Sequence, residues 1–168
     1  MRDLKRANAK LPAYKLLQEK NIQVFTPMRW CLSEEKGKKV RKQVPCVRDL
    51  LFVYDRRDTL DPIVEVIPTI QYRWLRNAYR EPMTVPNAEM ERFIRAVSVS
   101  ESPKYFLPEE ITPDMLNRKI RIVGGPLDGY EGTLVSTRGS KLKRLLVELP
   151  DLLAVGVEVN PEYIQVIE

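Results

Sequence analysis

A cluster of glycines near the carboxyl end of the chain constrains the fold more than any other feature. Three of the seven glycines, Gly125, Gly129 and Gly132, fall close together along the sequence. Glycine weakens regular elements, but it is favoured where the backbone needs a positive φ or a close approach. The spacing therefore predicts a tight loop that leads into a strand. We expect these glycines to form turns or bulges rather than to contact a ligand.

Short, closely spaced strands are predicted around this loop. Apolar runs bounded by turn residues indicate five strands, at 119–124, 130–137, 142–149, 153–159 and 162–167. So many short strands in so little sequence are typical of a small β-barrel, and we expect one over 118–168. The preceding segment, 100–117, contains prolines and acidic residues without a sustained period, which predicts a linker.

Residues 1–99 mix helical and strand patterns. Helical spacing predicts helices at 8–20, with Asn8 as the cap, at 56–66 and at 87–99. Strands are predicted at 22–32, 43–54, 70–76 and 83–85. This order fits an α+β fold, in which an N-terminal α/β sandwich with a mainly antiparallel sheet precedes the linker and the small barrel.

A basic stretch lies between the first two predicted strands. The residues from 33 to 42 include one glycine and five basic side chains: Lys36, Lys38, Lys39, Arg41 and Lys42. The pattern indicates a long β-hairpin with a basic tip. Two interpretations remain open at this point. The basic side chains either contact nucleic-acid phosphates, or they form a solvated loop that keeps the protein soluble.

The strand that ends at Tyr54 is apolar on both faces. Leu50, Phe52 and Tyr54 share one face, and Leu51 and Val53 share the other. Such a strand is either central in a covered sheet or leaves one face open as a binding patch. In the next predicted strand, the same alternation places Tyr72 and Trp74 on one face.

Composition excludes several kinds of enzyme. The chain has no histidine and only two cysteines, Cys31 and Cys46, which excludes conventional catalytic triads and histidine-based zinc hydrolases. No phosphate-loop pattern with its lysine and hydroxyl follows the glycines, so nucleotide hydrolysis is not expected. We therefore expect no enzymatic activity, no metal and no cofactor. A disulfide across the hairpin is geometrically conceivable, but a reducing cytosol disfavours it.

Charge and hydropathy indicate the compartment and the kind of partner. No apolar run approaches the roughly 20 residues of a membrane helix, and no signal segment opens the chain, so we expect a cytoplasmic protein without membrane contact. The net charge of +5 favours an acidic partner, such as nucleic acid or an acidic protein face.

The glycine-rich stretch resembles a known motif. Residues 120–134 contain the core pattern Gly-Pro-apolar-x-Gly-x-x-Gly and resemble a KOW motif, which in its family belongs to an SH3-like barrel. Residues 24–30, 48–54 and 85–94 resemble the NusG N-terminal domain. Over nearly its whole length the chain thus resembles the bacterial NusG family of transcription elongation and antitermination factors. It is most similar to the specialised paralogues of the UpxY type. Arg48-Asp49-Leu50, in place of the common Pro-Gly-Tyr or Pro-Asn-Tyr lead, favours a paralogue over a general NusG.

The resemblance implies that the two domains bind different partners. Residues 1–99 would bind the clamp helices of RNA polymerase through an apolar patch at Leu50 and Phe52, to which strand alternation adds Tyr54, Tyr72 and Trp74. The basic hairpin would contact nucleic acid of the elongation complex. The barrel would recruit a second partner, a small-subunit ribosomal protein or a termination factor, and we expect a monomer that suppresses pausing or termination. The alternative is a ribosome-associated or RNA-binding KOW structural protein.

Overall fold

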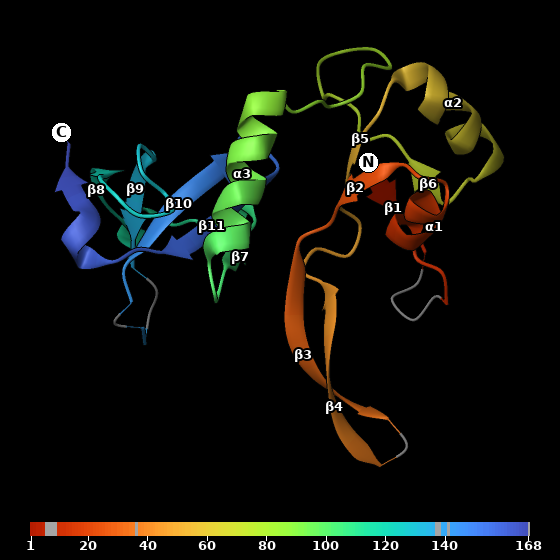
Figure 1. Ribbon diagram of the computed structural model, residues 1–168. Coiled ribbons are helices and arrows are strands. Elements are labelled where there is room, and N and C mark those ends of the chain that lie inside the picture. The colour runs from red at the N-terminus through yellow and green to blue at the C-terminus, as the bar shows by residue number, and fades with distance from the viewer. Residues whose placement is uncertain (6–9, 36, 137–138, 141, 168) are drawn as a thin grey trace. The chain divides into compact units, whose positions relative to one another are not determined.

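The fold combines α-helices with antiparallel sheets, as the sequence predicts (Figure 1). The computed structural model describes residues 1–5, 10–35, 37–136, 139–140 and 142–167, and these contain three α-helices. The chain divides into two units, Met1–Thr84 and Val85–Glu168. Within the described part of the chain, no helix is both long and apolar enough to cross a membrane.

The described residues of the first unit form three two-stranded sheets and two helices. Its elements are β1 (Arg2–Asp3), α1 (Ala13–Glu19), β2 (Gln23–Phe25), β3 (Met28–Glu35), β4 (Lys38–Pro45), β5 (Phe52–Tyr54), α2 (Arg57–Val66) and β6 (Ile70–Gln71). The sheets pair β1 with β6, β2 with β5, and β3 with β4. One core joins both helices to the strands, through buried side chains that include Leu17 of α1 and Leu60 of α2. The β3–β4 hairpin extends away from this core as a long ribbon (Figure 1).

Helix α1 begins later than the sequence pattern predicts. The expected cap, Asn8, lies outside the described residues, and the observed helix begins at Ala13, directly after Pro12. The amide of Ala13 donates to Asp3 Oδ2 at 2.7 Å, so a carboxylate from β1 satisfies a free amide at the start of the helix. Asn21, with a φ of 60°, follows the end of the helix.

The strand predicted over 70–76 is shorter than expected. Regular pairing is confined to β6, and beyond it Trp74 forms an isolated antiparallel bridge with Pro82. The amide of Met83 donates to the carbonyl of Arg73 at 2.7 Å, where a short return strand had been predicted. On the other side of the bridge the amide of Leu75 donates to the carbonyl of Glu81 at 2.9 Å, so these two bonds flank a single bridge and no longer ladder forms in the described residues.

In the second unit, the part of the chain that the structure describes forms one α-helix and a sheet of six strands. Its elements are α3 (Asn87–Val99), β7 (Lys104–Phe106), β8 (Leu116–Ile122), β9 (Glu131–Val135), β10 (Arg144–Leu149), β11 (Leu153–Glu158) and β12 (Ile164–Val166), with 3-10 turns at Pro108–Glu110, Pro113–Met115 and Pro161–Tyr163. The strand order is β12-β8-β9-β10-β11-β7. All five strands predicted after residue 117 are present. In the described residues the sheet is open rather than closed into a barrel, with β12 and β7 at its edges.

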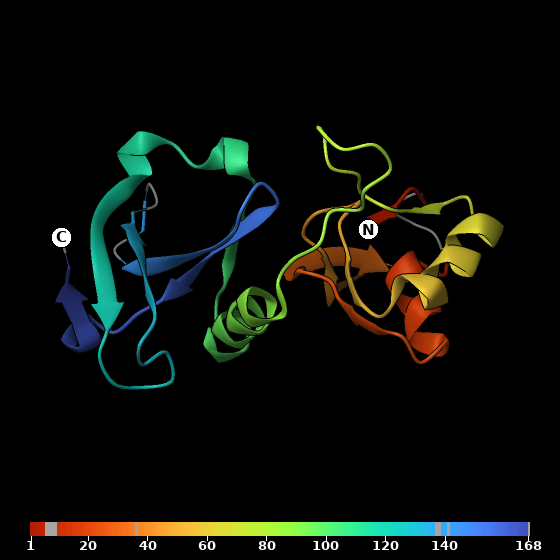
Figure 2. The ribbon, with the colours of Figure 1, turned by 90° about the horizontal axis from the view of Figure 1, so that it is seen from above.

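The segment predicted to be a linker contributes to this sheet. Its strand β7 pairs with β11, placing Phe106 opposite Ala154. Two 3-10 turns then carry the chain from this edge toward β8 (Figure 2). Ile111 and Met115, from the same segment, pack against a buried cluster that contains Phe106 and Leu146. Residues 100–117 are therefore part of the folded second unit.

Helix α3 also belongs to the second unit, whereas the sequence pattern groups it with residues 1–84. Its side chains Phe93 and Ala96 are fully buried, and the helix packs against β10 and β11. β11 is apolar and buried on both faces from Leu153 to Val157, and β10 is buried along its length except at Glu148. The helix therefore supplies part of the cover that these strands need.

Candidate functional site

An aromatic surface lies on the β2–β5 sheet of the first unit. Val24 pairs with Val53, and both pack against the core. Since side chains alternate along a strand, Phe25, Phe52 and Tyr54 lie on the opposite side of the sheet. The rings of Phe25 and Phe52 are 6.1 Å apart between centroids, and Tyr54 is 63% exposed. We refer to Phe25, Phe52 and Tyr54 as the aromatic face.

Two residues expected on an exposed binding patch are buried. Leu50 is only 3% exposed, and Tyr72 belongs to the core cluster. Leu50 precedes the first paired residue of β5, so the strand alternation that grouped it with Phe52 does not apply to it. As placed, neither side chain offers much surface to a partner. Phe52 is half-buried, and Tyr54 and Trp74 are exposed.

Trp74 lines a shallow concavity rather than the aromatic face. The concavity has a volume of about 590 Å³. It is lined by Arg57, Asp61, Val64, Glu65, Tyr72, Trp74 and Arg80. Tyr72 and Trp74 pack edge to face, with ring centroids 5.4 Å apart. Its lining combines two guanidinium groups with two carboxylates, so the concavity favours neither an anionic nor a cationic ligand.

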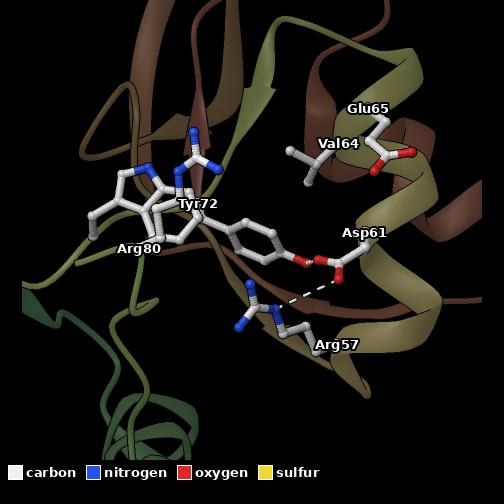
Figure 3. A pocket seen from close by; sticks show the side chains of 7 residues that line it. Arg57, Asp61, Val64, Glu65, Tyr72 and Arg80 are labelled. Carbon is white, nitrogen blue, oxygen red and sulfur yellow. Dashed lines mark hydrogen bonds and ion pairs between the residues drawn. The ribbon is translucent and has the colours of Figure 1, made fainter. Parts of the chain in front are cut away.

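Asp61 joins helix α2 to the strand side of this concavity. Its Oδ1 accepts a hydrogen bond from the hydroxyl of Tyr72 at 2.8 Å, and its Oδ2 lies 3.5 Å from Arg57 Nε (Figure 3). Burial, followed by the hydrogen bond to Asp61, raises the pKa of Tyr72 far above its usual value. Tyr72 therefore remains a neutral donor across the physiological pH range. It positions α2 and is unsuited to proton transfer.

The basic residues of the hairpin are divided between its two faces. Strand register places Leu32 opposite Arg41 and Glu34 opposite Lys39, whereas Cys31 is opposite Lys42 and Glu35 is opposite Lys38. Lys39 and Arg41 therefore share one face, and Lys38 and Lys42 share the other. The remaining predicted residue, Lys36, lies outside the described residues. Among the hairpin residues that are described, the one ion pair joins Lys42 to Glu35 at 3.3 Å.

The face with Lys39 and Arg41 also carries apolar side chains that the sequence analysis did not single out. Trp30 is 55% exposed, Leu32 is 74% exposed, and the Arg41 guanidinium carbon lies 4.7 Å from the centroid of the Trp30 ring. The sequence could have indicated this face, because Trp30 and Leu32 alternate along the first strand of the predicted hairpin. We refer to Trp30, Leu32, Lys39 and Arg41 as the Trp30 face.

Backbone conformation and close packing explain the motif glycines of the glycine-rich loop. Gly125 and Gly129 have φ values of 70° and 78°, which favour glycine. A Cβ on Gly125 would also meet the ring of Tyr163 at 3.1 Å. Gly132 lies in β9, where a Cβ would be 2.5 Å from the carbonyl oxygen of Leu146. The first two glycines thus allow the turn, and the third allows two strands to approach closely.

Hydrogen bonds and a cation–π contact join helix α3 to the same loop. The Tyr130 hydroxyl donates to the carbonyl of Arg92 at 2.9 Å. The Arg92 guanidinium lies 4.9 Å from the centroid of the Tyr130 ring and donates to the carbonyl of Glu131. Arg95 donates to the carbonyl of Pro126 at 3.3 Å. These contacts hold the loop against the helix and so stabilise the second unit.

Three substitutions separate these roles of glycine. Gly132→Ala is expected to lower the free energy of unfolding by about 2–3 kcal/mol, because the new Cβ would collide with a backbone oxygen. Gly129→Ala is expected to cost about 1 kcal/mol through its positive φ, and Gly129→Asn is expected to cost less, since asparagine tolerates that conformation. Urea denaturation measures all three. A Gly132→Ala variant as stable as the wild type would contradict the close approach of β9 and β10.

The described residues contain no group of three or more potential metal ligands among cysteine, histidine and carboxylate side chains. No disulfide joins Cys31 and Cys46, so the bond that is conceivable across the hairpin is not formed. No protein-family model matches the chain, and no curated protein matches it either. The proposals below therefore rest on the residues and their geometry.

Proposed function

We propose that the protein is a transcription elongation and antitermination factor of the NusG type, which binds the clamp of RNA polymerase and suppresses pausing or termination. The observation that carries the proposal is the aromatic face. It presents three aromatic side chains on the side of a sheet turned away from the core, and two of them lie in the stretch 48–54 that resembles NusG. Aromatic side chains bury large areas with few rotatable bonds, which suits the centre of a protein interface.

The finer fold assignment is part of the same proposal. It places a NusG N-terminal-like domain in residues 1–99 and a KOW domain with an SH3-like barrel in 118–168. The succession of β8 to β12 supports the second assignment. The turn at Gly125 and Gly129 and the close approach at Gly132 also support it, since they give the motif glycines structural roles.

The other parts of the molecule have supporting roles in this proposal. The exposed basic side chains of the hairpin contact nucleic acid of the elongation complex through their positive charge. The KOW domain recruits a small-subunit ribosomal protein or a termination factor. The protein acts as a monomer in the cytoplasm, without a cofactor, and it neither makes nor breaks a covalent bond.

The test is binding of the full chain to core RNA polymerase. Phe52→Asp and Tyr54→Asp are each expected to weaken binding at least tenfold, because each places a charge at the centre of an apolar contact. Affinities are measured by pull-down and by biolayer interferometry with immobilised polymerase. Tyr79→Asp is the matched control, since Tyr79 is an 88% exposed aromatic residue of the same unit outside the aromatic face. Its affinity for polymerase is expected to equal that of the wild type.

Three outcomes would contradict this assignment. If folded Tyr54→Asp and Phe52→Asp variants bind as tightly as the wild type, the aromatic face is not the binding surface. If Tyr79→Asp weakens binding equally, the effect is one of added negative charge. If the wild type does not bind polymerase but binds ribosomal RNA, the ribosome-associated alternative is favoured. Thermal unfolding of each variant shows whether Phe52→Asp, at a half-buried position, remains folded.

A further inference from the structure

The concavity beside helix α2 has opposite charges on opposite sides. It is lined by Arg80, from the segment that follows Trp74, and by Glu65, from α2. Figure 3 shows these two side chains on opposite sides of the concavity. The other two charged residues of the lining, Arg57 and Asp61, form an ion pair with each other at 3.5 Å. The lining therefore has no net charge, but its positive and negative groups are separated in space.

Glu65 and Arg80 are available to a ligand. Both side chains are exposed, and in the part of the chain that the structure describes neither of them forms an ion pair. The Arg80 guanidinium carbon lies 5.4 Å from the centroid of the Tyr79 ring, and a contact with a ring face leaves the N–H donors of a guanidinium group able to bind a carboxylate. Asp61, in contrast, already has a partner for each oxygen.

Trp74 and Val64 supply the apolar part of the lining. Trp74 is 43% exposed, and its edge-to-face packing with Tyr72 restricts the orientation of the ring. An exposed indole packs against apolar groups and also attracts an ammonium group placed over its face. The volume of about 590 Å³ falls within the usual range for small-molecule sites, about 300–1,000 Å³. The concavity thus combines an apolar surface with an available carboxylate and an available guanidinium group.

We infer that this concavity binds a small zwitterion, an amino acid or short peptide that carries a free ammonium and a free carboxylate group. The carboxylate pairs with Arg80, the ammonium pairs with Glu65, and an apolar side chain packs on Trp74. The two charges of such a ligand match the two available charges of the lining, and a guanidinium group binds a carboxylate through two parallel hydrogen bonds. A polyanion does not fit, because it leaves Glu65 without a cation. The inference goes beyond the proposed function and does not depend on it.

The test uses the dipeptide alanyl-phenylalanine and three modified forms of it. N-acetylation removes the ammonium charge, amidation of the carboxyl end removes the carboxylate charge, and the third form carries both changes. The unmodified dipeptide is expected to bind the full chain with a dissociation constant of about 0.1–10 mM, as for weak ligands of this size. Each single modification is expected to weaken binding at least about fivefold, because it leaves one charged group of the protein without a partner.

Calorimetry and fluorescence measure this binding independently. The chain has two tryptophans, so Trp30→Phe leaves Trp74 as the one indole. The dipeptide is expected to change the emission of Trp74, with the same dissociation constant that isothermal titration calorimetry gives. Trp74→Leu is expected to weaken binding in calorimetry at least about threefold, because it removes the ring. Phenylalanine is measured in parallel: tighter binding of phenylalanine identifies a free amino acid as the ligand, and tighter binding of the dipeptide identifies a peptide.

Two substitutions match the two modifications of the dipeptide. Arg80→Gln is expected to abolish the preference for the free carboxylate over the amide and to leave the preference for the free ammonium. Glu65→Gln is expected to have the reverse effect. Arg76→Gln and Glu81→Gln are the matched controls, since they remove an exposed charge of the same sign outside the lining, and both variants are expected to bind the dipeptide as the wild type does.

Several results would overturn the inference. These are no saturable binding of either the dipeptide or phenylalanine, equal binding of all four forms of the dipeptide, and equal effects of Arg80→Gln and Glu65→Gln on every form. Unchanged affinity in Trp74→Leu would mean that the ligand binds elsewhere on the chain. Tighter binding of guanosine monophosphate than of either zwitterion would make the concavity an anion site. The proposed function fails separately, because these measurements contain no polymerase.

Discussion

Replacing Phe93 with alanine is expected to lower the free energy of unfolding of the second unit by about 3–5 kcal/mol, the usual range for removing a buried phenylalanine. Phe93 is fully buried in α3, which packs against β10 and β11. The loss combines the transfer of apolar surface with the cavity left behind. Urea denaturation measures the total, and Glu91→Ala, at an exposed position of the same helix, is the control with an expected effect below about 0.5 kcal/mol.

Hydrogen exchange shows which unit loses stability in the Phe93 variant. Since α3 packs on the second unit, amides of β10 and β11 are expected to lose protection, while amides of α1 and α2 keep theirs. The opposite result would mean that the helix stabilises residues 1–84. That outcome would agree with the sequence pattern, which groups 1–99 as one domain, and would contradict the packing seen here.

The regular elements could be predicted where a strong local pattern fixes them. The spacing of glycines and apolar runs predicted β8 to β12, and helical periodicity predicted α2 and α3 to within a residue or two. The start of α1 could not be predicted, because the carboxylate that binds the Ala13 amide comes from Asp3 in another element. The packing of α3 is also non-local, since periodicity shows which face of a helix is apolar but not which sheet that face covers.

The candidate site could be predicted in outline but not in detail. The hairpin and its basic residues follow from composition and alternation, whereas the division of cations between two faces depends on strand register. Leu50 was expected on the exposed patch because alternation was counted from residue 50, but pairing in β5 begins at Phe52. Phe25 was missed because its position opposite Phe52 depends on β2 pairing with β5, two strands separated by the whole hairpin.

The ion pair between Arg144 and Glu158 gives the second large effect on stability. Arg144 Nη2 lies 3.1 Å from Glu158 Oε1, and the arginine side chain is only 8% exposed. Arg144 Nη1 also lies within 3.2 Å of Ser140 Oγ. Glu158→Ala is expected to destabilise the second unit by about 3 kcal/mol, because it removes the counter-charge of a buried guanidinium. This is the low end of the usual range, since Glu158 is 30% exposed and water can replace part of the interaction.

A second substitution distinguishes the buried charge from the loss of packing. Arg144→Met removes the charge and retains an apolar chain of similar length. The Glu158 carboxylate that it leaves unpaired is 30% exposed and can be hydrated, so the expected cost is about 1 kcal/mol, less than that of Glu158→Ala. Combining Arg144→Met with Glu158→Ala is therefore expected to restore stability relative to Glu158→Ala alone. Thermal and urea denaturation of the two single variants and the double variant measure this coupling. If the double variant loses as much free energy of unfolding as the two single variants together, the cost of Glu158→Ala does not come from the loss of a counter-charge. Interactions with other neighbours would then stabilise the Arg144 guanidinium.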